Sequence, residues 1–361
     1  MYVFFLCGYP SFVIQAHDIF LDRCKSNYSR YKYQFTLALQ PLIKESSFLT
    51  LQIHRDISAL PSFRNPVITI GTFDGVHLGH KQIINRLKEE ARSIDGETVI
   101  ITFYPHPRKI VTPGAHIALL NTTEEKIALL DKEKIDHLII VPFTDVFAEQ
   151  DATSYIKDFL VAKIHPHTII IGYDHRFGKG REGNYMMLEN FGAIWGFTVK
   201  EIPEKLLHEA AVSSTRIRQA LAEGNIATAN ELLGYSYFFT GTVVEGNRLG
   251  NTIGYPTANI RPGSEEKLIP ANGVYAVEVI VRGGKYQGMM NIGVRPTIGG
   301  TRRVIEVNIF GFSSDIYNSS ITVYFKYFLR SEQKFSGIDA LKQQLAEDKV
   351  NALRVLGEGR R

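Results

Sequence analysis

The segment "ITIGTFDGVHLGHKQII", Ile68–Ile84, decides the fold of the first half of this 361-residue chain. It begins as a β-branched apolar run, passes through three glycines, an aspartate and two histidines, and ends in a helical pattern. A strand that enters a helix through a glycine-rich turn is typical of parallel α/β sheets, which bind ligands at the carboxyl ends of their strands. A metal site and an ordinary strand-to-helix turn are the two alternatives.

The same alternation of strand and helix patterns continues from Pro66 to about Glu201. Short β-branched runs, "VITIGTF", "TVIITF", "HLIIV", "TIIIG" and "FTVKE", are separated by helical patterns such as "HKQIINRLKEEARSI". Thr122, three residues before Glu125, predicts a capping box. Near-continuous apolar strands imply a parallel sheet with both faces covered. The pattern predicts a doubly wound, Rossmann-like α/β domain over residues 51–234, whose last two helices end at Gly234.

Residues 235–361 follow a different pattern, which places the domain boundary near Tyr235. The segments "YFFTGTVVEG", "GVYAVEVIV", "YQGMMNIG", "RVIEVNIF" and "SITVYFKYFL" alternate polar and apolar residues and are rich in aromatic side chains. Such strands, with Gly, Asn and Pro between them, indicate a small antiparallel sheet or β-barrel. The segment "GIDALKQQLAEDKVNALRVL" predicts an amphipathic C-terminal helix.

Composition limits the kinds of partner. The net charge of +4 suits small anionic ligands and is too weak to indicate nucleic acid. The two cysteines, Cys7 and Cys24, have no metal-ligand spacing, so neither a disulfide framework nor a thiolate zinc site is expected, and a reducing, cytoplasmic location is predicted.

Residues 1–50 are expected to be an extension outside the core. Their apolar start, "MYVFFLCGYPSFVIQA", has no basic leader or small-residue cleavage site, is too short to span a bilayer, and is interrupted by Pro10. A signal or membrane anchor is the alternative; we predict no membrane association.

The glycines and histidines of "GTFDGVHLGH" suit phosphate binding. Gly71 and Gly75 would let the backbone approach a phosphate, and Gly79 would let the helix start pack closely. His77 and His80 share one face if the helix begins here, and two imidazoles could donate hydrogen bonds to phosphate oxygens.

Other ligand sites fit less well. There is no G-x-G-x-x-G motif for a dinucleotide. The segment "GYDHRFGKG" fails as a Walker loop, because five residues separate Gly172 from Gly178 and a glycine follows Lys179. Zinc on His77, His80 and His106 would lack an acidic or thiolate partner with suitable spacing.

"GTFDGVHLGH" resembles the H-x-G-H-type signature of nucleotidylyltransferases. With "TFYPHP" (102–107), "IGYDHRFGKGREGN" (171–184) and "VSSTRIRQAL" (212–221), it resembles the N-terminal half of prokaryotic bifunctional riboflavin kinase/FAD synthetases (FMN adenylyltransferases), a likeness that extends from about residue 51 to 355. The resemblance implies a nucleotidylyltransferase domain that joins FMN and ATP into FAD and pyrophosphate. It implies that His77 and His80 hold ATP phosphates. It also implies that Asp174 and Arg181 are candidates for flavin contacts. The remaining residues that it assigns to the nucleotide site are Gly71, Phe73, Ser213, Ser214, Thr215 and Arg216.

The segment "GNTIGYPTANI", Gly250–Ile260, is the second candidate site. Pro256 fixes a turn, and Thr257 and Asn259 offer oxygen ligands that Mg²⁺ could use beside nucleotide phosphates. A capped turn explains the spacing equally simply.

The Pro-Thr-Ala-Asn run is similar to the signature of riboflavin kinases, with "GVYAVEV", "MNIGVRPT", "VIEVNIFGF" and "YFLRSEQKF" in the same order. This resemblance implies a small β-barrel riboflavin kinase domain in which Thr257 and Asn259 bind Mg²⁺–ATP. Glu306 would be the general base for the riboflavin 5′-hydroxyl, and the flavin-contact candidates are Asn291, Arg295 and Arg330. The alternation in "RVIEVNIF" places Glu306 on the polar face of its strand, opposite Ile305 and Val307.

The sequence departs from the family pattern at four positions. His175 stands where the family has Phe, Asn308 where it has His or a similar residue, Gly311 where it has Asp, and Asn318 where it has Gly.

The leading hypothesis is one enzyme that makes FMN from riboflavin and then FAD, using ATP and Mg²⁺ in both steps. The alternative is an adenylyltransferase with a kinase-inactive, flavin-binding barrel. A nucleic-acid-binding barrel is a third possibility that the weak charge disfavours. The sequence makes no prediction of oligomeric state.

Overall fold

A computed structural model describes residues 51–112, 114, 117–203, 212–246, 249–297 and 300–358. The predicted extension, residues 1–50, lies outside these ranges. All described residues belong to one compact unit. In it a parallel sheet with its helices (52–202, the sheet lobe) is followed by a helix pair and a β-barrel with a final helix (238–358, the barrel lobe).

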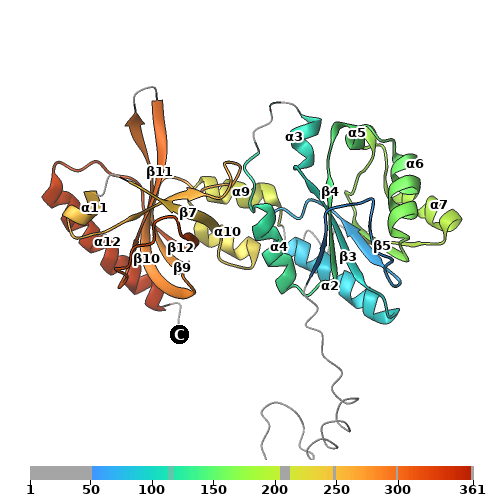
Figure 1. Ribbon diagram of the computed structural model, residues 1–361, viewed down its shortest axis with the longest axis horizontal. Coiled ribbons are helices and arrows are strands. Elements are labelled where there is room, and N and C mark those ends of the chain that lie inside the picture. Colours follow the sequence, from blue (N-terminus) through green and yellow to red (C-terminus); the bar gives the residue numbers. More distant parts are fainter. Residues whose placement is uncertain are drawn as a thin grey trace, which may run out of the picture. The chain divides into compact units, whose positions relative to one another are not determined.

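The strands of the sheet lobe form a six-stranded parallel sheet (Figure 1) in the order β1-β4-β3-β2-β5-β6. Its strands are β1 (Gln52–His54), β2 (Val67–Ile70), β3 (Thr98–Tyr104), β4 (His137–Pro142), β5 (Thr168–Gly172) and β6 (Thr198–Ile202). Successive residues of β2 face opposite sides: Ile68 and Ile70 belong to one apolar core and Val67 to another. The predicted doubly wound α/β fold is therefore confirmed.

Helices cover both faces of this sheet. One core packs the sheet against α2 (Leu78–Ser93) and α4 (Thr123–Lys132), and the other against the π-helix η1 (Tyr155–Ile164) and α7 (Tyr185–Trp195). Shorter helices occupy the remaining loops: α3 (Pro107–Val111), α5 (Asp145–Ala148), α6 (Ala152–Ser154) and η2 (Lys179–Arg181). The capping box predicted at Thr122 and Glu125 starts α4, with both reciprocal hydrogen bonds formed.

The elements β1 and η1 differ from the sequence prediction. β1 is an edge strand of three residues, too short to show a period. η1 has π-type hydrogen bonding, whereas the sequence predicted only a helix. Its buried residues, Tyr155, Ile156, Phe159, Leu160 and Ile164, are spaced by four or five, which suits α- and π-helices alike.

The strand order reverses direction beside β2. The chain moves from β2 to β3 and β4 on one side, then crosses to β5 on the other side of β2. The loops after β2 and β5 therefore open at the same edge of the sheet, at the switch point where open α/β sheets bind ligands. The loop after β2 is the signature "GTFDGVH".

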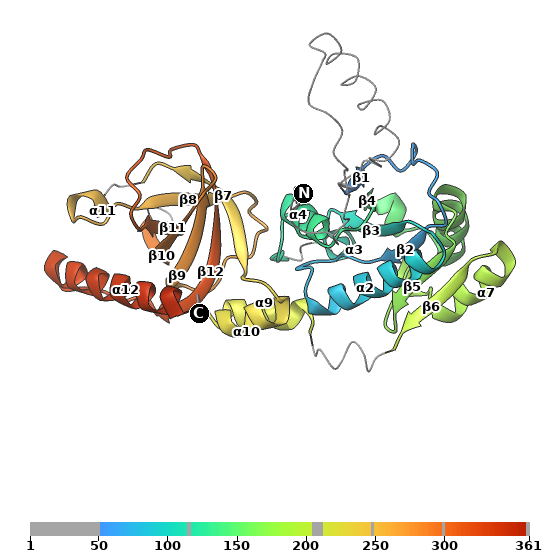
Figure 2. The ribbon, with the colours of Figure 1, turned by 90° about the horizontal axis from the view of Figure 1, so that it is seen from below.

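The second half is an antiparallel barrel, as predicted. It is closed, and its strand order is β10-β11-β8-β7-β12-β9. The strands are β7 (Phe238–Val244), β8 (Ala258–Pro262), β9 (Gly273–Val281), β10 (Gly284–Thr297), β11 (Gly300–Ile309) and β12 (Ser320–Arg330), with the short helix α11 (Leu249–Thr252) between β7 and β8. The predicted C-terminal helix, α12 (Ile338–Glu358), packs against β9, β10 and β12 (Figure 2).

The helix pair α9 (Ser214–Ala222) and α10 (Ile226–Leu233) packs on the barrel. Ile217, Leu221 and Leu233 share one core with barrel residues such as Phe239 and Phe325. Gly234 ends α10 in the left-handed conformation, as the sequence predicted.

A buried ion pair joins the two lobes. The Lys267 Nζ, from the barrel lobe, lies 2.7 Å from Glu125 Oε2 on α4 and donates to the Leu120 carbonyl at 2.5 Å. Glu125 Oε1 accepts the Thr240 N–H at 2.8 Å. Both side chains are almost fully buried, 0% and 3% exposed, so each charge depends on the other and on these hydrogen bonds.

No helix within the described ranges has the length and apolarity needed to cross a bilayer.

We expect Lys267→Met to lower the free energy of unfolding by about 3–5 kcal/mol, because it leaves the Glu125 carboxylate buried without its counter-charge. Urea unfolding of the full chain measures the effect. Arg86→Met, which breaks the exposed Arg86–Glu89 pair, is the control and should cost less than about 1 kcal/mol. Adding Glu125→Gln to Lys267→Met should recover part of the loss. Equal unfolding midpoints for Lys267→Met and the wild type would contradict the expectation.

Candidate active sites

The signature loop joins the end of β2 to the start of α2. His77 is the N-cap of α2, and its Nδ1 accepts the His80 N–H at 3.4 Å. Gly75 has a φ of +91°, and a Cβ there would lie 2.7 Å from the Leu120 side chain. Only glycine fits this turn without strain.

The two predicted phosphate-binding histidines lie together. The rings of His77 and His80 are stacked, with centroids 3.7 Å apart, and the Phe73 ring lies 4.9 Å from that of His80. Gly71 lies beneath Phe73, since a Cβ there would be 3.2 Å from its ring. The structure therefore brings four predicted nucleotide-site residues into one cluster.

Burial keeps both imidazoles neutral. It lowers the pKa of His77 to about 4, against an opposing effect of Asp74 and with a further lowering by Arg218. Burial, His77 and Lys126 lower the pKa of His80 well below its usual value. At neutral pH each ring therefore carries a single N–H that can donate to a phosphate oxygen.

Asp74 holds the loop in place and was not among the predicted site residues. Its carboxylate accepts the N–H groups of Leu120 at 3.0 Å and Asn121 at 3.2 Å, and pairs with Arg218 of α9. The residue is 2% exposed. Both residues lie inside the quoted motifs, Asp74 in "GTFDG" and Arg218 in "TRIR", which is the only sequence signal for them.

The predicted second clamp lies at the N-terminus of α9. Ser213 is the N-cap and accepts the Arg216 N–H at 3.3 Å, and the Ser214 hydroxyl donates to the Asp74 carbonyl at 2.9 Å. Thr215 and Arg216 are exposed. The helix N-terminus therefore lies against the signature loop, an arrangement that suits anion binding.

The flavin-contact candidates of the sheet lobe, Asp174 and Arg181, lie in the loop after β5. Asp174 and Arg181 are exposed, and among the described residues no hydrogen bond or ion pair joins them to the signature loop. His175, one of the four departures, stacks on Phe177 with ring centroids 6.0 Å apart, so this loop retains an aromatic contact.

In the barrel, three predicted residues form one row across neighbouring strands. Asn291 of β10 and Asn259 of β8 are the register partners of Glu306 on β11. The Glu306 carboxylate accepts from Arg295 at 3.0 and 3.2 Å. Its neighbours Ile305 and Val307 are buried while Glu306 is partly exposed, which confirms the predicted alternation.

Glycines pack against the Pro-Thr-Ala-Asn turn. A Cβ on Gly246 would collide with the Asn259 amide, and one on Gly250 would collide with the Tyr255 carbonyl and lie 3.2 Å from Thr257 Oγ1. Asn308, another departure, donates to the Pro256 carbonyl at 2.6 Å and so fastens the turn to β11.

Arg330 lies apart from this row. It forms two hydrogen bonds, of 2.8 and 2.7 Å, to the buried carboxylate of Asp348 on α12. The remaining departures are turn positions with positive φ, +67° at Gly311 and +59° at Asn318, a region that glycine, asparagine and aspartate all tolerate.

The barrel cluster suits a magnesium ion that also binds nucleotide phosphates. Thr257 and Asn259 supply oxygen atoms, the donor element of Mg²⁺ sites, to which nucleotide phosphates would add the anionic ligands. The lack of a Cβ on Gly246 lets the Asn259 amide occupy its present position. The described residues contain no cluster of three or more His, Cys, Asp or Glu side chains that could hold a metal.

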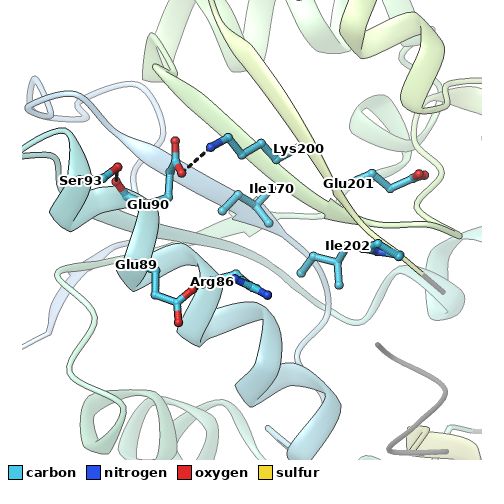
Figure 3. Close-up of a pocket in the computed structure, with 9 residues that line it drawn as sticks. Arg86, Glu89, Glu90, Ser93, Ile170, Lys200, Glu201 and Ile202 are labelled. Atoms are coloured by element: carbon cyan, nitrogen blue, oxygen red, sulfur yellow. Dashed lines mark hydrogen bonds and ion pairs between the residues drawn. The ribbon is translucent and has the colours of Figure 1, made fainter. Parts of the chain in front are cut away.

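A cavity of about 440 Å³ lies elsewhere, between α2 and β6 (Figure 3). The Glu90–Lys200 ion pair, 2.6 Å long, connects its two sides. None of the predicted site residues is among those that line it: Arg86, Glu89, Glu90, Ser93, Ile170, Lys200, Glu201, Ile202 and Pro203.

These features define a two-lobed protein with an H-x-G-H-type nucleotide loop on a parallel sheet and a Pro-Thr-Ala-Asn turn on a small β-barrel. The family model described as FAD synthetase matches residues 60–216, and the one described as riboflavin kinase matches residues 233–356.

Similar proteins agree with these matches. The chain is 38% identical to the bifunctional riboflavin kinase/FMN adenylyltransferase of Escherichia coli (strain K12), over 81% of this chain and 93% of the relative. It is 39% identical to the protein of the same name from Haemophilus influenzae, over 78% and 91%. A crystal structure titled as a macrolide-efflux protein from Streptococcus pneumoniae shares the fold, with a TM-score of 0.74, 30% identity, and coverage of 83% and 97%. The chain belongs to the bifunctional riboflavin kinase/FMN adenylyltransferase family.

We expect acid to destabilise the protein through His77. Because its pKa falls from about 6.5 in the unfolded chain to about 4 in the folded one, the unfolded chain binds the extra proton below pH 6.5. The free energy of unfolding should therefore fall by roughly 2 kcal/mol between pH 7 and pH 5 from this residue. Urea unfolding at both pH values compares the wild type with His77→Asn, which retains an N-cap acceptor. The variant should lose less stability, and an equal loss in both proteins would refute the assignment.

Proposed function

We propose that this chain phosphorylates riboflavin to FMN in its barrel lobe and adenylylates FMN to FAD in its sheet lobe. The observation that carries the proposal is that each lobe matches its own family model and contains its own polar cluster. The kinase-inactive alternative is not favoured, because the barrel matches the riboflavin kinase model over residues 233–356.

In the sheet lobe, the FMN phosphate attacks the α-phosphorus of ATP, a new P–O–P bond forms, and pyrophosphate leaves. The nucleophile is already an anion, so the residues are needed for positioning and charge stabilisation. His77 and His80 donate hydrogen bonds to phosphate oxygens. Gly71 and Phe73 line the nucleotide site, and a second phosphate clamp consists of Ser213, Ser214, Thr215 and Arg216. Asp174 and Arg181 are the flavin-contact candidates.

In the barrel lobe, Glu306 takes the proton from the riboflavin 5′-hydroxyl while that oxygen attacks the γ-phosphorus of ATP and ADP leaves. A carboxylate suits this step because the loose phosphoryl-transfer transition state mainly needs an oriented nucleophile. The contact of Arg295 with both Glu306 oxygens supports an orienting role for Arg295. Asn291 and Arg330 are the other flavin-contact candidates.

Thr257 and Asn259 would hold Mg²⁺, which neutralises phosphate charge when bound. We further propose a division into residues 51–234 and 235–361, the cytoplasm as location, and small-molecule substrates as partners, without nucleic acid or membrane. The mild net charge of +4 supports the absence of nucleic-acid binding.

Incubation with riboflavin, ATP and Mg²⁺, with flavins separated by chromatography, tests the proposal. FMN should appear first and FAD later. If neither appears, the bifunctional proposal is wrong, and FAD made only from supplied FMN would select the kinase-inactive alternative.

Two single variants should separate the steps. His80→Ala should lower FAD formation by about 10²-fold while FMN accumulates, because it removes a donor to the phosphates. Glu306→Ala should lower FMN formation by about 10²–10⁴-fold and leave adenylylation of supplied FMN intact. Loss of both steps from either substitution, in a folded protein, would refute the two-site assignment.

Gly246→Ala should impair the kinase step selectively, by at least about tenfold, since the new Cβ would displace the Asn259 amide from its present position. Rates of both steps are measured over a range of Mg²⁺ concentrations. Gly337→Ala, whose Cβ would meet no atom within 4 Å, is the matched control. A wild-type kinase rate and Mg²⁺ dependence in Gly246→Ala would exclude Asn259 as a magnesium ligand.

A further inference from the structure

Lys126, in the first turn of α4, lies against the signature loop although the sequence did not single it out. Its Nζ donates to the Thr72 carbonyl at 2.6 Å and to Thr102 Oγ1 at 3.3 Å. The Thr102 hydroxyl itself donates to the same Thr72 carbonyl at 3.1 Å. The ammonium group therefore joins the loop after β2 to strand β3.

The bonded carbonyl precedes a strained residue. Phe73, directly after Thr72, has a φ of +48°, which a residue with a bulky side chain adopts only when its surroundings hold it there. The Phe73 ring in turn contacts that of His80. Fixing the Thr72 carbonyl therefore fixes the ring that supports His80.

Lys126 has no carboxylate ion-pair partner among the described residues. Asp74, whose charge acts on it, is already paired with Arg218. Burial lowers the pKa of Lys126 to about 8, against an opposing effect of Asp74. The ammonium charge is thus not neutralised by a carboxylate partner in the described ranges, and it acts on His80 and His106.

The charge of Lys126 acts on His80. Its Nδ1 is buried and has no hydrogen-bond partner within the part of the chain that the structure describes. A positive charge nearby disfavours a second one on the imidazole. Three other charged groups, Asp74, Arg218 and Arg108, lie in this environment. They act on the neighbouring groups His77, His106 and Lys126.

We propose that Lys126 is a positioning residue for adenylyl transfer: its ammonium group holds the Thr72 carbonyl, and through it Phe73 and His80. Its charge also adds, after burial and His77, to the lowering of the pKa of His80. This inference rests on the proposed function of the sheet lobe. It assigns to α4 a role in the nucleotide site beyond covering the sheet.

The test measures adenylylation of supplied FMN by the full chain across pH, with riboflavin phosphorylation as the internal control. Lys126→Met should lower kcat for FAD formation by about 10²-fold, as expected for a displaced binding group, and move the acid limb of its pH profile upward. Lys126→Arg should restore much of the rate. It should also move the alkaline limb, expected near pH 8 in the wild type, to higher pH, because a guanidinium stays protonated.

Lys132→Met, an exposed lysine on the same helix, is the matched control and should leave both activities unchanged. A wild-type rate and pH profile in Lys126→Met would overturn the proposal, as would an unmoved alkaline limb in Lys126→Arg. Parallel loss of both activities with a lower melting temperature would assign Lys126 a purely structural role and also overturn it. Failure of the wild type to make FAD from FMN would instead refute the proposed function.

Discussion

The buried carboxylate of Asp74 is the interaction on which the site of the sheet lobe depends. A charge that is 2% exposed must have its lone pairs satisfied, and here they accept from Leu120, Asn121 and Arg218. The Asp74 carbonyl also accepts the Ser214 hydroxyl. The signature loop, the segment before α4 and the start of α9 therefore meet at one residue, although up to 144 positions separate them in the chain. Removal of this carboxylate would release all three segments together.

The same set of contacts continues into the barrel lobe through a single residue. Leu120 donates its N–H to Asp74, and its carbonyl accepts from Lys267, the barrel residue that pairs with Glu125. Glu125 also caps α4 and accepts the N–H of Thr240 on β7. Two buried charges, one from each lobe, thus depend on the short segment between Leu120 and Glu125. The nucleotide loop and the first barrel strand, β7, therefore both form hydrogen bonds with that segment. Lys126, the next residue in the chain, donates to the Thr72 carbonyl of the same loop.

Residues close in sequence could be predicted, and those that depend on distant partners could not. Periodicity predicted β2 to β6, the two-residue alternation placed Glu306 on the polar face, and the spacing of Thr122 and Glu125 predicted the cap of α4. Lys267 lies in the polar run "SEEK", which is typical of exposed chain, and only the fold brings Glu125 to it. The sequence did not predict strand β8, which begins inside the Pro-Thr-Ala-Asn motif, because its hydrogen-bonding partners lie on the distant strands β7 and β11. The role of Asp74 likewise requires residues from α9, which local pattern does not reveal.

The two clusters differ in the way their proposed chemistries require. An FMN phosphate is already ionised, so adenylyl transfer needs donors and no base. In the sheet lobe the carboxylate of Asp74 is occupied by three donors, and the histidines are neutral donors with lowered pKa values. A riboflavin hydroxyl must lose its proton, so phosphorylation needs an acceptor. In the barrel lobe the carboxylate of Glu306 is partly exposed, lies between two asparagines on neighbouring strands, and contacts a single arginine, Arg295, among the described residues. The carboxylate that serves structure is fully bonded, whereas the one proposed to serve catalysis retains lone pairs that can accept a proton.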